Sequence, residues 1–249
     1  MSEASPPAAI VGAEGLTKRF GPLLAVDRVD LEVHEGESVV LFGPNGAGKT
    51  TLIRILCMSL RPTSGRVLIA GLDPRKDDLE IRRRIGLISH QSYLYDDLTA
   101  RQNLEFFSRL HGVPDPAARA EELLEQFELA NRADDAVGTF SRGMQQRVSL
   151  ARSLVHDPPL VFLDEPFTGL DPYAAEMLRR TLEVLRDQRR TLVLVTHDLR
   201  QGLELSDRWL LLSRGRIVHK GVSKETDADS FDAASFRRLA QDARRARPA

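Results

Sequence analysis

Residues 43–51 read Gly43-Pro44-Asn45-Gly46-Ala47-Gly48-Lys49-Thr50-Thr51, and this segment decides the fold. It follows an apolar run, Ser38 to Phe42, that predicts a buried strand, and it leads into a predicted helix. Glycines let successive backbone amides face one concavity at the start of a helix, where an anion can bind. We therefore interpret the segment as a phosphate-binding loop, with an ordinary glycine-rich turn as the alternative.

The residue types in this loop match the parts of a nucleotide. We expect the amides at Gly43, Gly46 and Gly48 to surround the phosphates. Lys49 is expected to reach the β- and γ-phosphates as a point charge, and the Thr50 hydroxyl to coordinate a Mg²⁺ that bridges them. The predicted binding segment also includes the remaining loop residues, Pro44, Asn45, Ala47 and Thr51.

Composition excludes several other classes of protein. The formal net charge of -1 gives no basic footprint for nucleic acid, so a nucleic-acid partner is disfavoured. The single cysteine, Cys57, permits no disulfide within the chain and is expected to be a small buried side chain. No run of about 18 apolar residues predicts a membrane-spanning helix. The histidines lack metal-ligand spacing, so no zinc or iron site is predicted.

The chain is predicted to contain two lobes beside an α/β core. Residues 1–9 are rich in Ser, Pro and Ala and are expected to form a disordered leader without a signal peptide. Alternation at 29–33 and a β-rich stretch at 67–70 predict a small antiparallel sheet. Between about 97 and 157 the pattern is helical, beginning with a capping box at Thr99 and Gln102, and predicts an inserted helical lobe.

The second half of the chain returns to alternating strands and helices. Aliphatic runs at 160–163 and 191–196 flank an amphipathic helix, which predicts a βαβ unit with parallel strands. Residues 209–218 predict a closing hairpin. The charged tail, 225–249, is either a short helix or a solvated, frayed end.

Polar residues follow three of the predicted strands. Asp164 and Glu165 stand at the carboxyl end of a buried strand, where open α/β sheets bind ligands. Asp164 is expected to hold Mg²⁺ and Glu165 to polarise the water that attacks the γ-phosphate, with an ordinary surface pair as the alternative. His197 ends the next strand and could contact the γ-phosphate, although it could also be structural. Gln91 offers an amide for Mg²⁺ or water.

Residues 140–147, Phe140-Ser141-Arg142-Gly143-Met144-Gln145-Gln146-Arg147, complete a set of motifs that resembles the ATPase subunit of ATP-binding cassette (ABC) transporters. In that family the segment is a signature loop, usually Leu-Ser-Gly-Gly-Gln. Ser141 and Gly143 match it, whereas Arg142 and Met144 depart from its third and fifth positions. The resemblance covers about residues 11–221. It implies a P-loop NTPase (RecA-like) core with an antiparallel β lobe and a helical lobe, and an ATPase domain over residues 10–224.

The resemblance also implies roles that geometry alone does not give. Phe20 resembles the aromatic residue that stacks on adenine, with a buried loop aromatic as the alternative, and Asp171 ends a loop that links two ATP sites. Family members form head-to-tail dimers, in which Ser141 and Gly143 cover the ATP held by the phosphate loop of a second copy. Gln91 and residues 92–97 would pass this motion to a membrane subunit on a separate chain. The protein is then expected at the cytoplasmic face of the membrane.

Three functional classes fit the motifs to different degrees. A transporter subunit is favoured over a soluble cassette ATPase, because only a compact helical lobe separates Lys49 from Asp164 and no second cassette is present. A nucleotide-binding module without turnover is disfavoured by Glu165 and His197. Within transporters the signature variant resembles exporters, particularly heme exporters of cytochrome c maturation. A drug-type or multidrug-type exporter is the alternative.

Overall fold

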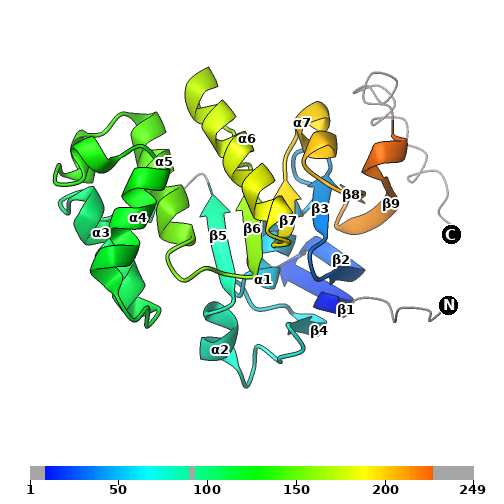
Figure 1. Ribbon diagram of the computed structural model, residues 1–249. Coiled ribbons are helices and arrows are strands. Elements are labelled where there is room, and N and C mark those ends of the chain that lie inside the picture. The colour runs from blue at the N-terminus through cyan, green and yellow to red at the C-terminus, as the bar shows by residue number, and fades with distance from the viewer. Residues whose placement is uncertain (1–8, 90–92, 227–249) are drawn as a thin grey trace, which may run out of the picture.

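The computed structural model describes residues 9–89 and 93–226 of the chain. Its centre is a six-stranded sheet in the order β5-β6-β7-β3-β8-β9, in which only β9 is antiparallel to its neighbour (Figure 1). The bounds are Ile85–Ser89 for β5, Leu160–Asp164 for β6, Thr191–Val195 for β7, Ser38–Phe42 for β3, Arg208–Ser213 for β8 and Arg216–Val222 for β9. The predicted α/β class, the parallel βαβ unit and the closing hairpin are confirmed.

The central strands are apolar without interruption because both faces of the sheet are covered. All five residues of β3, β6 and β7 are buried. Successive side chains point to opposite faces, so Val39 and Leu41 enter one hydrophobic cluster while Val40 and Phe42 enter another. The phosphate loop and the carboxylate pair therefore leave the sheet at its carboxyl edge, from strands held on both sides.

One face of the sheet carries the β lobe and the first helix. Helix α1, Lys49–Leu56, packs there with a three-stranded antiparallel sheet in the order β2-β1-β4. The strands are β1 Ala9–Phe20, β2 Leu23–His34 and β4 Ser64–Ile69, and α2, Asp78–Arg82, follows them. The predicted leader ended one residue too late, because Ala9 is already paired with His34 in β1. Residues 1–8 lie outside the described part.

The other face of the sheet carries α5, α6 and α7, with the helical lobe beyond them (Figure 1). The bounds are α3 Ala100–Leu110, α4 Pro116–Gln126, α5 Arg142–Ser153, α6 Pro172–Asp187 and α7 Leu199–Glu204, with 3-10 turns at Ala130–Arg132, Val137–Thr139 and Ser223–Glu225. The capping box at Thr99 and Gln102 is confirmed. Of the predicted tail only Glu225 and Thr226 are described, and 227–249 lie outside the described residues.

A cluster of aromatic and basic side chains joins the helical lobe to the core. The rings of His111, after α3, and His156, after α5, stack with centroids 3.9 Å apart. His156 Nε2 lies 3.0 Å from the Ile85 carbonyl oxygen of β5. Arg152 donates from Nη2 to the Leu87 carbonyl oxygen at 3.1 Å. Burial lowers the pKa of His156 to about 4, with further lowering by His111 and Arg152. We call His111, Arg152 and His156 the lobe joint.

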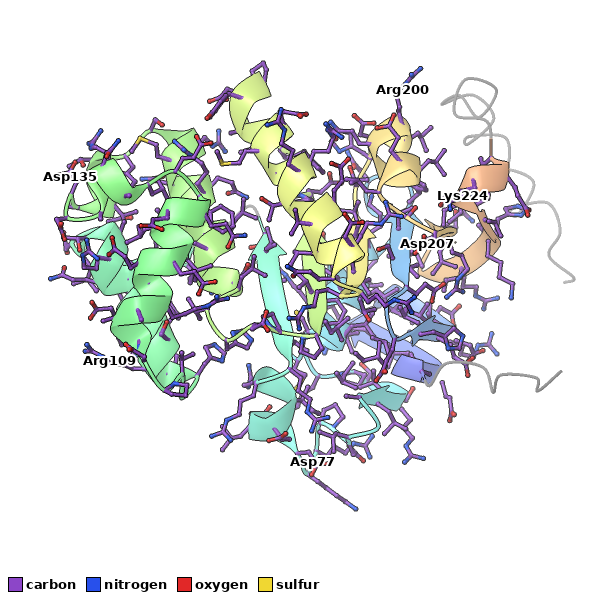
Figure 2. The ribbon with its side chains drawn as sticks, viewed as in Figure 1. Asp77, Arg109, Asp135, Arg200, Asp207 and Lys224 are labelled. Atoms are coloured by element: carbon purple, nitrogen blue, oxygen red, sulfur yellow. The ribbon has the colours of Figure 1, made fainter. Side chains whose placement is uncertain are left out.

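Charged side chains of both signs project from every layer, as the labelled Asp77, Arg109, Asp135, Arg200 and Lys224 illustrate (Figure 2). Cys57 is 3% exposed at the end of α1, as expected for a small core residue. Over residues 9–89 and 93–226, no helix combines the length and the apolar character that crossing a membrane requires.

Candidate nucleotide site

The phosphate loop is shaped by close approaches of the backbone. Gly48 has a φ of 103°, and a Cβ there would lie 2.1 Å from the Ala25 carbonyl oxygen. A Cβ on Gly43 would lie 2.3 Å from the Leu212 carbonyl oxygen. Neither contact tolerates a side chain, whereas Gly46, with a φ of 78°, has open space around its Cα. The loop is therefore tightly seated on β8 and β2 while its Gly46 turn stays open.

The start of α1 differs from the starts of the five helices α3 to α7. Side chains cap α3, α4, α5, α6 and α7, each by accepting a first-turn amide. Helix α1 has Gly48 at its N-cap, no side-chain cap and no acidic residue in its first turn. Its orphan amides and helix dipole therefore present partial positive charge without a capping side chain.

Lys49 adds a full charge to this helix start. Its ammonium donates hydrogen bonds to the carbonyl oxygens of Gly43 at 2.7 Å and Pro44 at 3.3 Å, and the residue is 7% exposed. Burial lowers the pKa of Lys49, an effect that the nearby carboxylates of Glu165 and Asp164 partly oppose. A buried ammonium held by two carbonyl oxygens has donor capacity left for an anion.

Two oxygen atoms that could coordinate a metal, from distant parts of the sequence, meet beside the loop. The Thr50 hydroxyl donates to Asp164 Oδ1 at 3.3 Å, and Asp164 is 4% exposed at the end of β6. Hydroxyl and carboxylate oxygens suit Mg²⁺, which takes few protein ligands and completes its shell with water and phosphate oxygens. The described residues hold no group of three or more His, Cys, Asp or Glu side chains placed to bind a metal. This donor pair thus fits a metal that arrives with a phosphate.

Glu165 and His197 form a pair at the ends of neighbouring parallel strands. His197 Nδ1 lies 2.8 Å from Glu165 Oε2, and the Glu165 amide donates to the Val195 carbonyl oxygen at 2.9 Å. Glu165 has a φ of 51°, a conformation that is uncommon for residues other than glycine. The side chain of Glu165 is 25% exposed and that of His197 is 70% exposed. The carboxylate is thus held in place by an imidazole yet remains open to water.

Three further predicted site residues, Phe20, Ser141 and Gly143, are described and make no hydrogen bond to this group within the described ranges. Phe20 ends β1 with 47% of its surface exposed, and the Lys18 ammonium stands 5.1 Å from its ring centroid. Gln91 lies outside the described residues. Ser141 caps α5 and Gly143 is in its first turn. No hydrogen bond within the described part of the chain joins either residue to the phosphate loop.

The signature segment instead contacts the segment 168–171 of the same chain. A Cβ on Gly143 would lie 3.1 Å from Asp171 Oδ2, while Asp171 Oδ1 accepts the Ala174 amide at 2.8 Å as the cap of α6. A Cβ on Gly169 would lie 3.1 Å from Arg142 Cζ. Sequence reasoning treated Arg142 only as a departure from a pattern and gave it no role. The available signal was a charged residue placed between Ser141 and Gly143, but its contact could not be read from spacing.

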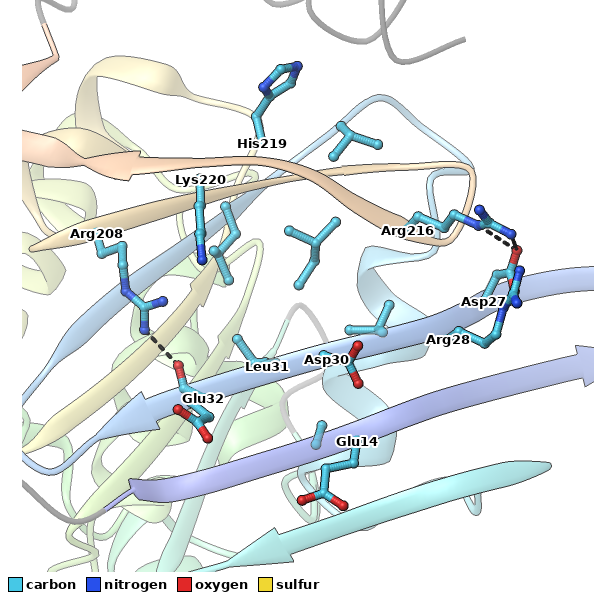
Figure 3. A pocket seen from close by; sticks show the side chains of 15 residues that line it. Glu14, Asp27, Arg28, Asp30, Leu31, Glu32, Arg208, Arg216, His219 and Lys220 are labelled. Atoms are coloured by element: carbon cyan, nitrogen blue, oxygen red, sulfur yellow. Dashed lines mark hydrogen bonds and ion pairs between the residues drawn. The ribbon is translucent and has the colours of Figure 1, made fainter. Parts of the chain in front are cut away.

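A large cavity lies elsewhere in the molecule. It has a volume of about 940 Å³ and lies between β2 and β9 (Figure 3). Ion pairs stand at its two ends, Arg208 with Glu37 and Arg216 with Asp27. None of the predicted nucleotide-site residues lines it. The candidate site is therefore identified by converging charges at the sheet edge and not by concavity.

Comparison with known proteins agrees with this arrangement. A family model described as ABC transporter matches residues 26–168. The chain is 40% identical over 222 residues to the daunorubicin resistance ATP-binding protein DrrA3 of Streptomyces coeruleorubidus, an alignment that covers 88% of this chain and 70% of that protein. It is 36% identical over 201 residues to the ABC transporter ATP-binding protein NatA of Bacillus subtilis, covering 80% and 82%.

Solved structures share the fold over most of the chain. The dimeric post-hydrolysis state of the ATP-binding cassette MJ0796, bound to ADP and Pi, superposes with a TM-score of 0.78 at 30% identity and covers 86% of this chain and 98% of that one. An ATP-binding subunit of an ABC transporter superposes with a TM-score of 0.83 at 28% identity, covering 94% and 99%.

Proposed function

Because this chain belongs to the ABC transporter family, as one of its ATP-hydrolysing subunits, we propose that it energises the export of a drug-type small molecule through a membrane subunit on a separate chain. The observation that carries the proposal is the convergence of three motifs on one sheet edge. Thr50 lies 3.3 Å from Asp164, and Glu165 lies 2.8 Å from His197. Glu165 and Asp164 both interact electrostatically with Lys49, the first residue of the uncapped helix α1.

At the carboxyl edge of the central sheet, some residues would bind the nucleotide and others would act in its hydrolysis. Lys49 and the amides of Gly43, Gly46 and Gly48 bind the β- and γ-phosphates, since the ammonium and the helix start are positive groups at this edge. Thr50 and Asp164 would hold Mg²⁺, which would offset charge on the phosphate oxygens; Gln91, the third predicted ligand, is outside the described residues. Glu165 orients and polarises the attacking water, and His197 fixes the carboxylate.

A second copy of the chain completes each ATP site. The start of α5, with Ser141 and Gly143, offers a hydroxyl, backbone amides and a helix dipole, but within one chain no hydrogen bond joins it to the phosphate loop. A head-to-tail dimer would bring this helix start over the phosphate loop of its partner. The MJ0796 cassette, a solved structure to which this chain is similar, is dimeric. Phe20, half-exposed at the end of β1, supplies an aromatic face for the adenine base.

An aromatic surface next to the helical lobe fits the membrane subunit. Tyr95 is 51% and Phe106 41% exposed, and their rings meet edge to face at 5.2 Å. Tyr93 and Leu110, 50% and 68% exposed, are further large side chains of residues 93–110 left open. Exposed aromatic side chains at one site are typical of protein interfaces. This surface follows Gln91 in sequence, in the segment that the family resemblance assigns to the membrane subunit. Docking of that subunit here would hold the protein at the cytoplasmic face of the membrane.

The cargo is the least constrained part of the proposal. The relatives bear names of daunorubicin and doxorubicin resistance proteins and of a probable multidrug transporter protein. These names favour a drug-type exporter, which was the alternative in the sequence analysis. They give no support to heme export for cytochrome c maturation.

The two cargo hypotheses predict different phenotypes. Cells that lack this chain should accumulate more daunorubicin, measured by its fluorescence, and should keep their covalently bound c-type heme. Complementation with the intact chain should restore efflux, and complementation with Lys49→Ala should not. Normal daunorubicin efflux together with a loss of c-type heme would instead establish the heme reading.

A further inference from the structure

Arg142 lies flat against a loop of the core. A Cβ built on Gly169 would stand 3.1 Å from Arg142 Cζ and 3.2 Å and 3.4 Å from its two Nη atoms, so the whole guanidinium group covers this glycine. Gly169 has a φ of 76°, and its lack of a side chain leaves room for the guanidinium. Arg142 makes no hydrogen bond or ion pair with any residue in the described ranges. Its contact with Gly169 is one of packing.

A second contact joins the same two segments. Asp171 uses Oδ1 to cap α6 and places Oδ2 against Gly143, in the first turn of α5. The carboxylate thus stands at the positive ends of two helices, where it is favourable. Arg142 with Gly169, and Gly143 with Asp171, are two adjacent contacts between the signature segment and segment 168–171.

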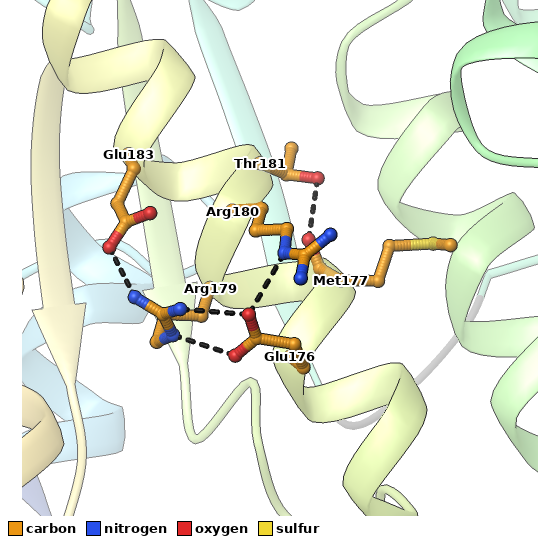
Figure 4. A network of polar contacts seen from close by, with 6 residues as sticks. All are labelled: Glu176, Met177, Arg179, Arg180, Thr181 and Glu183. Atoms are coloured by element: carbon orange, nitrogen blue, oxygen red, sulfur yellow. Dashed lines mark hydrogen bonds and ion pairs between the residues drawn. The ribbon is translucent and has the colours of Figure 1, made fainter.

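The core side of this contact is firmly held. Glu176 pairs with Arg179 and Arg180, and Arg179 also pairs with Glu183, so that a ladder of ion pairs runs along α6 (Figure 4). The hydrogen bond to Arg179 is the main reason that the pKa of Glu176 is only about 2. Tyr173, in the first turn of α6, donates to a Glu128 carboxylate oxygen of the helical lobe. The hydrogen bond of Tyr173 therefore joins the start of α6 to the helical lobe.

We propose that Arg142 is a positioning residue for ATP hydrolysis. Its guanidinium holds segment 168–171 against the signature segment of the same subunit, so that each subunit brings both loops to the dimer interface as one unit. This inference rests on the proposed two-subunit ATP site. Without the guanidinium, the loops still fold but reach the partner's nucleotide in less uniform geometry, which slows hydrolysis more than it weakens binding.

The test measures kcat and KM for ATP hydrolysis on the purified full-length chain carrying Arg142→Ala, Arg142→Lys or Arg109→Ala. Arg142→Ala should lower kcat roughly tenfold while KM changes little. Arg142→Lys keeps the charge but not the planar face, so kcat should remain low. Arg109→Ala removes an exposed arginine of α3, outside both segments, and should keep the original kcat. Unchanged unfolding midpoints in all three variants separate positioning from folding.

A double-mutant cycle tests the contact itself. Gly169→Ala introduces both backbone strain and a clash with the guanidinium, but only the clash depends on Arg142. The fall in kcat caused by Gly169→Ala should therefore be smaller in the Arg142→Ala background. Additive effects, or a raised KM at unchanged kcat for Arg142→Ala, would overturn the inference.

Failure of the proposed function can be distinguished from failure of the inference about Arg142. If Glu165→Gln forms an ATP-dependent dimer while Arg142→Ala hydrolyses ATP normally, only the role of Arg142 is wrong. If the intact chain neither hydrolyses ATP nor dimerises with it in the Glu165→Gln form, the two-subunit site is wrong and the inference falls with it.

Discussion

Helices α1 and α5 both begin with residues assigned to phosphate, yet their first turns are built differently. Helix α1 has a left-handed Gly48 at its N-cap, no side-chain cap and a buried lysine as its first residue. Helix α5 is capped by the Ser141 hydroxyl, which accepts the Met144 amide at 3.3 Å, and its first turn touches the Asp171 carboxylate.

This difference suggests two kinds of anion site. We call the proposed site at α1 permanent, because it is present in a single chain, and the proposed site at α5 conditional, because it needs a second subunit. No side chain in the described ranges caps the first-turn amides of α1, so an anion can bind them without displacing a cap. At α5 the Ser141 hydroxyl and the Asp171 carboxylate already interact with the first turn of the helix, so a phosphate has to compete with them. We therefore expect nucleotide to bind first at α1, and α5 to engage only when a second subunit delivers that nucleotide.

The largest expected effect concerns turnover at the α1 side. Glu165→Gln should lower kcat by roughly 10²- to 10⁴-fold, because it removes the base that polarises water while the phosphate ligands remain. ATP and Mg²⁺ should then shift the variant from monomer to dimer on size-exclusion chromatography. Glu125→Gln, an exposed residue of α4, serves as the control. If Glu165→Gln stays monomeric and hydrolyses ATP normally, the proposed difference between α1 and α5 is wrong.

Binding at α1 should depend strongly on its lysine. Lys49→Ala should weaken ATP binding ten- to hundredfold, in line with roughly 1.5–3 kcal/mol for a hydrogen bond to a charged group. Isothermal titration calorimetry measures this directly, with the exposed Lys76→Ala as control. If both variants bind ATP as the unmodified chain does, α1 is not the permanent site.

The lobe joint, which sets α5 relative to the core, should make stability depend on pH. The pKa of His156 is lowered from 6.5 to about 4 by burial, His111 and Arg152, with Asp157 and the Ile85 carbonyl acting in the opposite direction. Between these pH values the unfolded chain binds a proton that the folded chain does not. Stability contributed by neutral His156 is therefore lost as pH falls from 6.5 towards 4.

Urea unfolding between pH 7.5 and 4.5 tests this expectation. His156→Gln cannot titrate, so its loss of stability over this range should be smaller by roughly 2 kcal/mol, allowing for partial exposure. His219→Gln, on β9, is the control. An identical decline in the intact chain and in His156→Gln would show that the joint does not sense pH.

The smallest expected effect concerns the cap of α5. Ser141→Ala and Thr99→Ala each remove an N-cap from the helical lobe, and each should reduce stability by about 1 kcal/mol in urea unfolding. In the Glu165→Gln background, only the loss at Ser141 should weaken the ATP-dependent dimer. Equal dimerisation of the two variants would remove α5 from the nucleotide site.

Local patterns in the sequence predicted much of this molecule. The apolar run before Gly43 and the capping box at Thr99 were readable because each depends on neighbours within a few residues. The βαβ unit followed from its periodicity, and with it the meeting of Asp164, Glu165 and His197 at one edge. The β lobe was predicted correctly, except that β1 begins already at Ala9.

By itself, then, the sequence determined the elements, their caps and the residue types at the sheet edge, because hydrophobic periodicity and capping are local. Only the tertiary structure decided the strand order, the 2.8 Å pairing of His197 with Glu165 and the seating of Gly48 against Ala25. It alone placed Arg142 on Gly169 and stacked His111 on His156. These contacts join residues 23 to 45 positions apart, and their geometry depends on how whole elements pack, which no local pattern encodes.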